Sequence, residues 1–172
     1  WEYFNIGKEN EYSNVLSGSS IYDSKWFDGA KVNYCQNVFT KRDDHTAIIA
    51  INEECQQIIV SYAELYLQVA NIAAYFRSIG LTKGDRVAAY MTNSLEAVVS
   101  FLATASIGAI WSSCAPEFGV NSVVQRFGQI APKILIASNG YRYAGKNHSR
   151  IEQIEQLIEK IPSIKHTILV EN

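Results

Sequence analysis

The 172-residue chain has little of several features that mark special protein classes. It contains only 3 cysteines, 3 prolines and 1 methionine, and its 15 basic and 17 acidic side chains leave a net charge of -2. Cys35, Cys55 and Cys114 form no Cys-x-x-Cys pair and cannot all pair within the chain, which disfavours a disulfide framework or a zinc ribbon. We therefore expect a reducing, cytoplasmic setting.

Charge stripes and long apolar runs are also absent. No cluster of Lys and Arg could displace many phosphate counterions, so nucleic acid is not an expected partner. The longest apolar run, residues 97–111, is interrupted by polar residues and is shorter than the roughly 20 residues that span a bilayer, so no membrane partner is expected either. The chain starts at Trp1 without a signal-like segment, which indicates a fragment or a processed chain.

The composition is otherwise that of a globular domain, with 48% hydrophobic and 12% aromatic residues. A chain near this length should bury roughly 70% of its extended-state surface. Residues 1–41 are rich in aromatics but keep neither a helical nor a strand period. We expect an irregular wrapping segment, with a short helix at most, whose aromatic rings lie on a larger body.

A regular pattern starts after residue 45. Two β-branched runs, residues 46–50 and 57–60, flank a polar stretch and predict a hairpin. Ser61 and Glu64 then form a capping box, and apolar residues at helical spacing follow until Gly80 ends the helix. This helix is the clearest element in the sequence.

Short apolar runs then alternate with amphipathic stretches. Strands are expected at residues 86–91, 109–112, 133–137 and 167–170. Helices are expected at residues 94–107, after a cap at Asn121 or Ser122, and after a second capping box formed by Ser149 and Glu152. Such alternation predicts an α/β fold with a doubly wound parallel sheet.

Ligands of open α/β sheets bind beyond the carboxyl ends of the strands, which directs attention to residues 92–93, 113–121 and 138–148. The chain contains neither G-x-G-x-x-G nor G-x-x-x-x-G-K-[ST], so NAD or ATP binding by those motifs is unsupported. Cys114 in the second loop has no His nearby in sequence, which favours a packed thiol over a nucleophile. His45, His148 and His166 lack metal-ligand spacing, so no metal site is expected.

The third loop brings Arg142 and Lys146 together with Tyr141 and Tyr143 beside flexible glycines. Arg offers a planar fork to phosphate, Lys offers a point charge, and a Tyr face can stack on a nucleobase. The loop is therefore the best candidate in this chain for binding a phosphorylated ligand. On the pattern alone, a solvated loop with incidental charge is the stronger interpretation, because isolated cations in loops are common.

Three runs carry a family resemblance. They are WFDGAKVNYCQN at residues 26–37, the stretch from SYAELYLQ to APEFG at residues 61–119, and QRFGQIAPKIL with GYRYAGK at residues 125–135 and 140–146. Together they resemble the beginning of acyl-CoA synthetases of the adenylate-forming, AMP-binding superfamily. The runs IWSSCAPEFG, QRFGQIAPKIL and GYRYAGK are more similar to the branch that activates acetoacetate than to the branches that activate acetate or propionate.

The resemblance implies a two-step reaction in which ATP and acetoacetate give an acyl-adenylate, and CoA then captures the acyl group, with Mg²⁺ on the polyphosphate. Residues 1–41 would be the N-terminal segment found in acetyl-CoA synthetases, and residues 42–172 the first, incomplete part of the AMP-binding domain. The family's phosphate loop, ribose-binding aspartate, acyl pocket and catalytic lysine have no matching positions here. We therefore expect the opening piece of a ligase, with no catalytic residue, inactive without its downstream part.

Basic residues on the loop that corresponds to GYRYAGK hold the CoA phosphates in related acetyl-CoA synthetases. The resemblance thus implies that Arg142 and Lys146 contact CoA in the complete protein. Alternatives are a stand-alone module that binds CoA or a nucleotide without catalysis, an acetyl- or propionyl-activating synthetase, and a product of gene decay.

Overall fold

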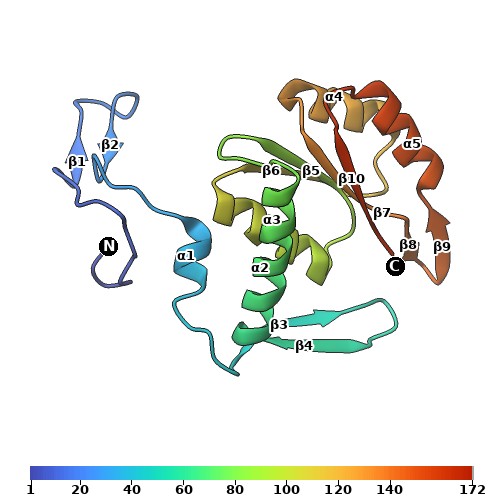
Figure 1. Ribbon diagram of the computed structural model, residues 1–172, viewed down its shortest axis with the longest axis horizontal. Coiled ribbons are helices and arrows are strands. Elements are labelled where there is room, and N and C mark those ends of the chain that lie inside the picture. The colour runs from blue at the N-terminus through green and yellow to red at the C-terminus, as the bar shows by residue number, and fades with distance from the viewer. Residues whose placement is uncertain (172) are drawn as a thin grey trace. The chain divides into compact units, whose positions relative to one another are not determined.

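The computed structural model describes residues 1–171 and divides the chain into two compact units, Trp1–Thr40 and a second that starts at Lys41. The first unit holds an antiparallel pair of very short strands, β1 (Leu16–Ser17) and β2 (Lys25–Trp26), and the helix α1 (Tyr34–Val38). Figure 1 shows these elements joined by long irregular stretches. The prediction of an irregular segment with a short helix is confirmed, and the strand pair is an addition.

Aromatic rings of the first unit pack on one another. The Phe27 ring lies 4.2 Å from the Trp1 ring and 5.3 Å from the Tyr12 ring, measured between centroids. Tyr3, Phe4 and other rings of the segment are exposed. A small aromatic cluster thus forms inside this unit. That the rings lie on a larger body stays a prediction.

The second unit is built on a parallel sheet of four strands in the order β10-β7-β5-β6. These strands are β5 (Arg86–Tyr90), β6 (Ile110–Cys114), β7 (Ile134–Ser138) and β10 (His166–Val170). Ala88 of the central strand β5 stands opposite Ser112 on one side and Leu135 on the other. All four strands were predicted, with ends that differ by one or two residues.

Helices cover both faces of this sheet, as Figure 1 shows, with α2 (Tyr62–Ser78) and α3 (Leu95–Ile107) on one face and α4 (Val120–Ile130) and α5 (Ile151–Lys160) on the other. The α4 and α5 face is a contiguous core whose buried members include Ala88, Tyr90, Leu135, Phe127 and Leu157. Because side chains alternate along a strand, Val87 and Ala89 of β5 point to the opposite face. The predicted doubly wound α/β layer is confirmed.

The two capping boxes that the sequence predicted have different outcomes. At α2, the amide of Glu64 donates to Ser61 Oγ (3.2 Å), and the amide of Ser61 donates to Glu64 Oε2 (2.8 Å). At α5, the N-cap residue is Arg150 and its side chain makes no capping bond, because Ser149 lies in a strand ladder opposite Gly140 and accepts only one long hydrogen bond, from the amide of Ile151 (3.5 Å). The prediction at Ser149 and Glu152 is therefore wrong. The cap of α4 is also corrected, from Asn121 or Ser122 to Gly119.

Two antiparallel hairpins complete the second unit. The first, β3 (Thr46–Ile51) with β4 (Gln57–Ser61), was predicted. The second, β8 (Gly140–Tyr143) with β9 (Lys146–Ser149), replaces the predicted loop at residues 138–148. Its turn residues Ala144 and Gly145 both have positive φ, 50° and 74°, as the central residues of a type I′ turn do. Asn-Gly is the usual sequence signal for this turn, and because Ala-Gly is not, the sequence did not predict the hairpin.

None of the described helices is both long enough and apolar enough to cross a membrane.

Candidate functional site

The loops after β5, β6 and β7 lie at the carboxyl edge of the sheet, where open α/β folds bind ligands. The loop after β6 is fastened from two sides. The buried Tyr90 hydroxyl at the end of β5 shares its one proton between the Pro116 carbonyl (2.6 Å) and the Phe118 carbonyl (2.8 Å). Burial raises the pKa of Tyr90, which keeps the phenol protonated as a donor.

Arg150 is the second fastening. Its Nε donates to the same Pro116 carbonyl (2.7 Å), and its Nη2 donates to the Tyr141 hydroxyl (2.8 Å). The guanidinium also lies 4.9 Å from the centroid of the Tyr141 ring, and the His148 ring stacks on that tyrosine at 5.0 Å. Arg150 thus ties the loop after β6 to the β8–β9 hairpin. Sequence reasoning missed it, because the supposed capping box drew attention to Ser149.

These contacts give the two tyrosines of the hairpin different roles. Tyr141 is occupied by Arg150 and His148 and holds the hairpin to its neighbours. Tyr143 is 70% exposed and leaves a ring surface open to solvent. Of the two tyrosines that the sequence proposed for base stacking, Tyr143 is therefore the better candidate.

The two predicted phosphate contacts, Arg142 and Lys146, lie on opposite strands of the same hairpin. In the ladder, Arg142 pairs with Asn147 and Tyr143 pairs with Lys146. Because paired residues share a face and successive residues alternate, the two cations belong to opposite faces of the ribbon. The structure therefore places them on one element but does not converge them on a single point.

The surroundings of the two cations also differ. Arg142 Nε lies 3.7 Å from Glu53 Oε2, and Arg142 Nη1 contacts Glu54 Oε1, both from the tip of the β3–β4 hairpin. Lys146 is exposed, and within residues 1–171 no ion pair is recorded for its ammonium group. Arg142 is held by carboxylates, while Lys146 faces solvent.

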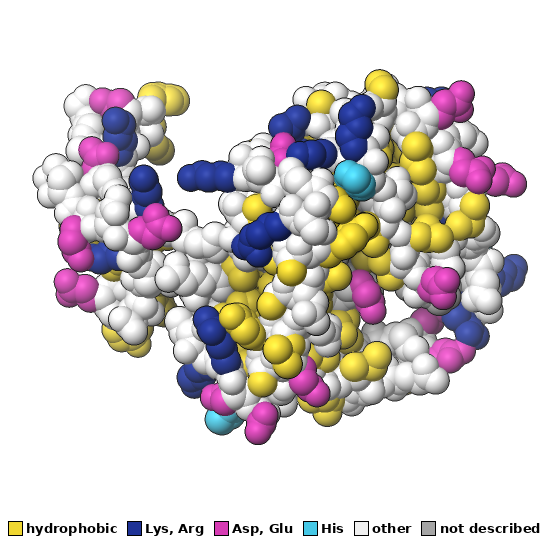
Figure 2. All heavy atoms as spheres, viewed as in Figure 1, with side chains coloured by type: hydrophobic (Ala, Val, Ile, Leu, Met, Phe, Trp, Pro, Cys, Tyr) yellow, Lys and Arg dark blue, Asp and Glu magenta, His cyan; other side chains and the backbone are white. Residues whose placement is uncertain are grey.

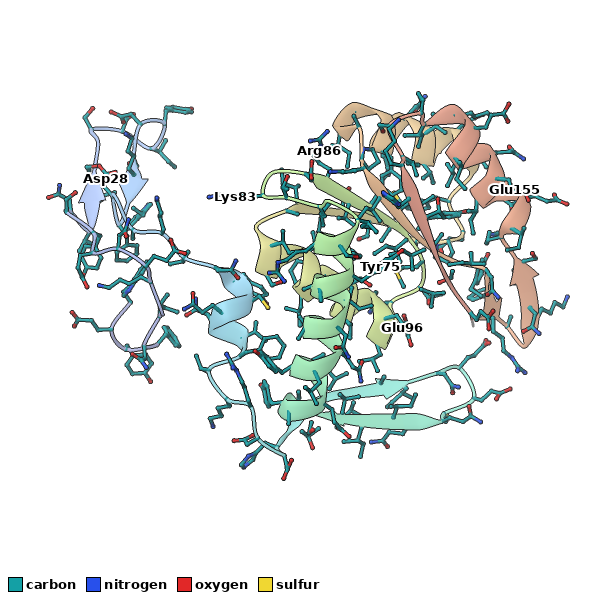
Figure 3. The ribbon with its side chains drawn as sticks, in the orientation of Figure 1. Asp28, Tyr75, Lys83, Arg86, Glu96 and Glu155 are labelled. Carbon is teal, nitrogen blue, oxygen red and sulfur yellow. The ribbon has the colours of Figure 1, made fainter. Side chains whose placement is uncertain are left out.

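A groove of about 1230 Å³ runs between the two hairpins and the start of α3. Isoleucines of β3 and β4 line one side, and Tyr141, Arg142 and His148 line the other. Figure 2 shows apolar side chains gathered over the middle of this unit, and Figure 3 places Glu96 near the start of α3, beside the β3–β4 hairpin. Arg142 and its ion-pair partners Glu53 and Glu54 therefore line a groove large enough for a ligand.

A second cavity of about 390 Å³ lies at the ends of β5 and β6, lined by Thr92, Asn93, Phe101, Trp111 and Cys114 among others. Burial raises the pKa of the Cys114 thiol, and the nearby Arg126 opposes this only in part. A thiol with a raised pKa is a poor nucleophile. The interpretation of Cys114 as a packed residue is consistent with this environment.

Comparison with known proteins places this architecture in a family. Residues 35–172 match the model of the AMP-binding enzyme family, which covers most of the chain. The chain belongs to the AMP-binding enzyme family. The match includes both the β3–β4 and the β8–β9 hairpins, the whole four-stranded sheet and the loops at its carboxyl edge.

Several relatives within this family carry the same name. The chain is 40% identical to the acetoacetyl-CoA synthetase of Macaca fascicularis over 99% of its own length and 26% of the relative. It is 39% identical to the acetoacetyl-coenzyme A synthetase of Rhizobium meliloti over 85% of this chain and 22% of that protein. A solved structure of acetoacetyl-CoA synthetase from Streptomyces lividans superimposes with a TM-score of 0.94 and 37% identity, covering 99% of this chain and 27% of that one.

This member of the AMP-binding family thus spans about a quarter of the length of the relatives it matches. The fold predicted from the resemblance is confirmed, and so is the family. The roles of Arg142 and Lys146 stay predictions, because the likeness as a whole assigns no ligand to either side chain.

Proposed function

We propose that this chain forms part of an acetoacetate–CoA ligase. The supporting observation is that identity of 37–40% to acetoacetyl-CoA synthetases extends over 99% of the chain in relatives as distant as a macaque and a Streptomyces. The malonamoyl-CoA synthetase of Penicillium aethiopicum, which is named for a different acid, is 29% identical over the same share of the chain. This contrast favours acetoacetate as the acid.

The proposed reaction has two steps in the complete polypeptide. An acetoacetate carboxylate oxygen attacks the α-phosphorus of ATP, the bond to the β-phosphate breaks, and diphosphate leaves from the acyl-adenylate. The CoA thiol then gives up its proton to solvent, its sulfur attacks the acyl carbon, and AMP departs with the electron pair of the broken C–O bond. Mg²⁺ neutralises the polyphosphate charge in such chemistry. We assign no catalytic residue to this chain, and ATP and Mg²⁺ are proposed only for the complete enzyme.

The part that we assign to this chain is binding of CoA at the β8–β9 hairpin. Arg142 is an exposed cation that lines a groove of ligand size. Lys146 is exposed on the other face of the ribbon, which the exposed Tyr143 shares. CoA carries a diphosphate bridge and a separate 3′-phosphate. Because the two cations belong to opposite faces of the ribbon, we propose that each contacts a different phosphate group.

The test uses the complete polypeptide and the double variant R142A/K146A. We expect the KM for CoA to rise about tenfold or more, because each charge-assisted contact contributes roughly 1.5–3 kcal/mol at most and less when exposed. ATP–pyrophosphate exchange driven by acetoacetate, which needs no CoA, reports whether the variant is folded. The variant R77A/K160A removes two exposed cations from helix ends and is the matched control.

A KM for CoA that is the same in R142A/K146A and in R77A/K160A would refute the assignment of the hairpin. The identity of the acid has its own test. The complete polypeptide should show its highest kcat/KM with acetoacetate among acetoacetate, acetate and propionate. A preference for acetate or propionate would refute the proposed substrate but not the CoA site.

A further inference from the structure

The tip of the β3–β4 hairpin meets the turn of the β8–β9 hairpin although 88 residues separate Glu54 from Arg142. Glu54 contacts Arg142 Nη1, and Glu53 Oε2 lies 3.7 Å from Arg142 Nε. The other oxygen of Glu53 accepts a hydrogen bond from the amide of Gly145 (3.3 Å). Two carboxylates in succession thus face one guanidinium and the turn beside it.

The tip that presents these carboxylates has a defined shape. Asn52 Oδ1 accepts hydrogen bonds from the amides of Glu54 (3.0 Å) and Gln56 (2.9 Å), and Asn52 Nδ2 donates to Gln56 Oε1 (2.7 Å). Cys55 takes a positive φ of 61° within the same turn. An Asn side chain that bonds its own backbone in this way fixes a turn locally. The placement of Glu53 and Glu54 therefore does not depend on Arg142.

The carboxylates also cancel the charge of the candidate CoA site. Arg142 and Lys146 supply two positive charges to the β8–β9 hairpin, and Glu53 and Glu54 bring two negative charges against it. A phosphate that approaches the site meets a nearly neutral patch. It must also take donors of the guanidinium that the carboxylates already use, because a carboxylate and a phosphate bind the same fork.

We propose that Glu53 and Glu54 form a carboxylate latch that occupies Arg142 without ligand and that a CoA phosphate displaces. The inference rests on the proposed binding of CoA at this hairpin. The latch is weak enough to open, because the side chains of Arg142, Glu53 and Glu54 are 46%, 39% and 44% exposed. Ion pairs of this exposure contribute little, since water screens them. The latch therefore lowers the affinity for CoA without abolishing binding.

The experiment measures CoA kinetics of the complete polypeptide carrying E53Q/E54Q. Glutamine keeps the size of each side chain and removes the charge, so Asn52 continues to shape the turn. We expect the KM for CoA to be about two- to tenfold lower than in the unmodified protein, because the exposed site then carries two uncompensated positive charges. For the same reason, the KM of the variant should increase more steeply as salt is added. In an R142A background, the same pair of substitutions should have a much smaller effect.

The control variant is E155Q/E159Q, which removes two exposed carboxylates from α5 and changes the net charge equally. Figure 3 shows Glu155 pointing outward from that helix. The control should leave the KM for CoA unchanged. An equal fall in both variants would mean that overall charge, and not the latch, sets the affinity, and would overturn the proposal.

The remaining outcomes separate the latch from the site itself. If R142A/K146A raises the KM for CoA but E53Q/E54Q leaves it unchanged, the CoA site stands and the latch is refuted. If E53Q/E54Q raises the KM, the carboxylates orient Arg142 for the ligand, which also refutes the latch. If R142A/K146A has no effect on CoA, the site fails and the latch fails with it.

Discussion

Replacing Tyr90 by phenylalanine tests whether the loop after β6 is held by one buried hydroxyl. Tyr90 is 1% exposed, and its hydroxyl shares one proton between the carbonyls of Pro116 (2.6 Å) and Phe118 (2.8 Å). Phenylalanine fills the same space, so no large cavity adds to the cost. The Pro116 carbonyl keeps its bond from Arg150, whereas no other hydrogen bond to the Phe118 carbonyl is recorded in the described chain.

The expected cost of Y90F follows from this difference. Leaving one buried acceptor without a donor costs about 1–3 kcal/mol. Thermal unfolding of the complete polypeptide measures the loss, and hydrogen exchange of amides 115–119 reports it locally, with faster exchange expected in Y90F. The matched control is Y75F, which removes the hydroxyl of a half-exposed tyrosine on α2, labelled in Figure 3. It should change stability by less than about 0.5 kcal/mol.

Equal Tm values and equal exchange at residues 115–119 in Y90F and Y75F would refute the anchoring role of Tyr90. A large loss in Y90F without faster exchange in that loop would also contradict it. In that case the hydroxyl would stabilise the core and not the loop that it bonds.

Two further predictions concern the same part of the molecule. Burial raises the pKa of Tyr90 above the usual 10.0, so the stability that this shift contributes is complete below pH 10 and is lost as the pH rises through the folded-state pKa. The alkaline fall in Tm should therefore be steeper in the unmodified protein than in Y90F. Identical slopes would contradict this. At the β8–β9 turn, Ala144 has a φ of 50°, which asparagine tolerates better than alanine. A144N should slow amide exchange in the hairpin and stabilise it by about 0.5–1 kcal/mol, whereas faster exchange would refute the type I′ interpretation.

The elements that the sequence predicted well are those whose signals are local. The capping box at Ser61 and Glu64 needs only residues three apart, and buried strands such as β5 are short apolar runs. The same reasoning failed at Ser149, although the spacing to Glu152 is identical. There the β8–β9 ladder competes for the backbone, and a ladder that closes through Ala-Gly leaves no turn signal in the sequence.

The candidate site depends on contacts that no local pattern contains. Arg142 and Lys146 were identified by residue type and by their place after β7, but their opposite faces follow from the hairpin register, which the sequence did not predict. Likewise, Glu53 and Glu54 looked like the polar middle of a distant hairpin, and Arg150 looked like a residue inside a cap. Their roles arise because the parallel sheet brings its carboxyl-end loops together and the β3–β4 hairpin reaches the same edge.

Because the opposite charges lie on two separate hairpins, the charge beside Arg142 can change without disturbing the fold of either hairpin. Each hairpin is closed by its own turn, one by Asn52 and the other by Ala144 and Gly145, so neither turn needs the ion pairs to form. Changing a carboxylate at the tip therefore alters the charge beside Arg142 at little cost in folding, because exposed ion pairs contribute little to stability. Affinity for an anionic ligand can thus be set by residues that never touch the ligand, which is the physical reason to look for such control at the tip of the β3–β4 hairpin.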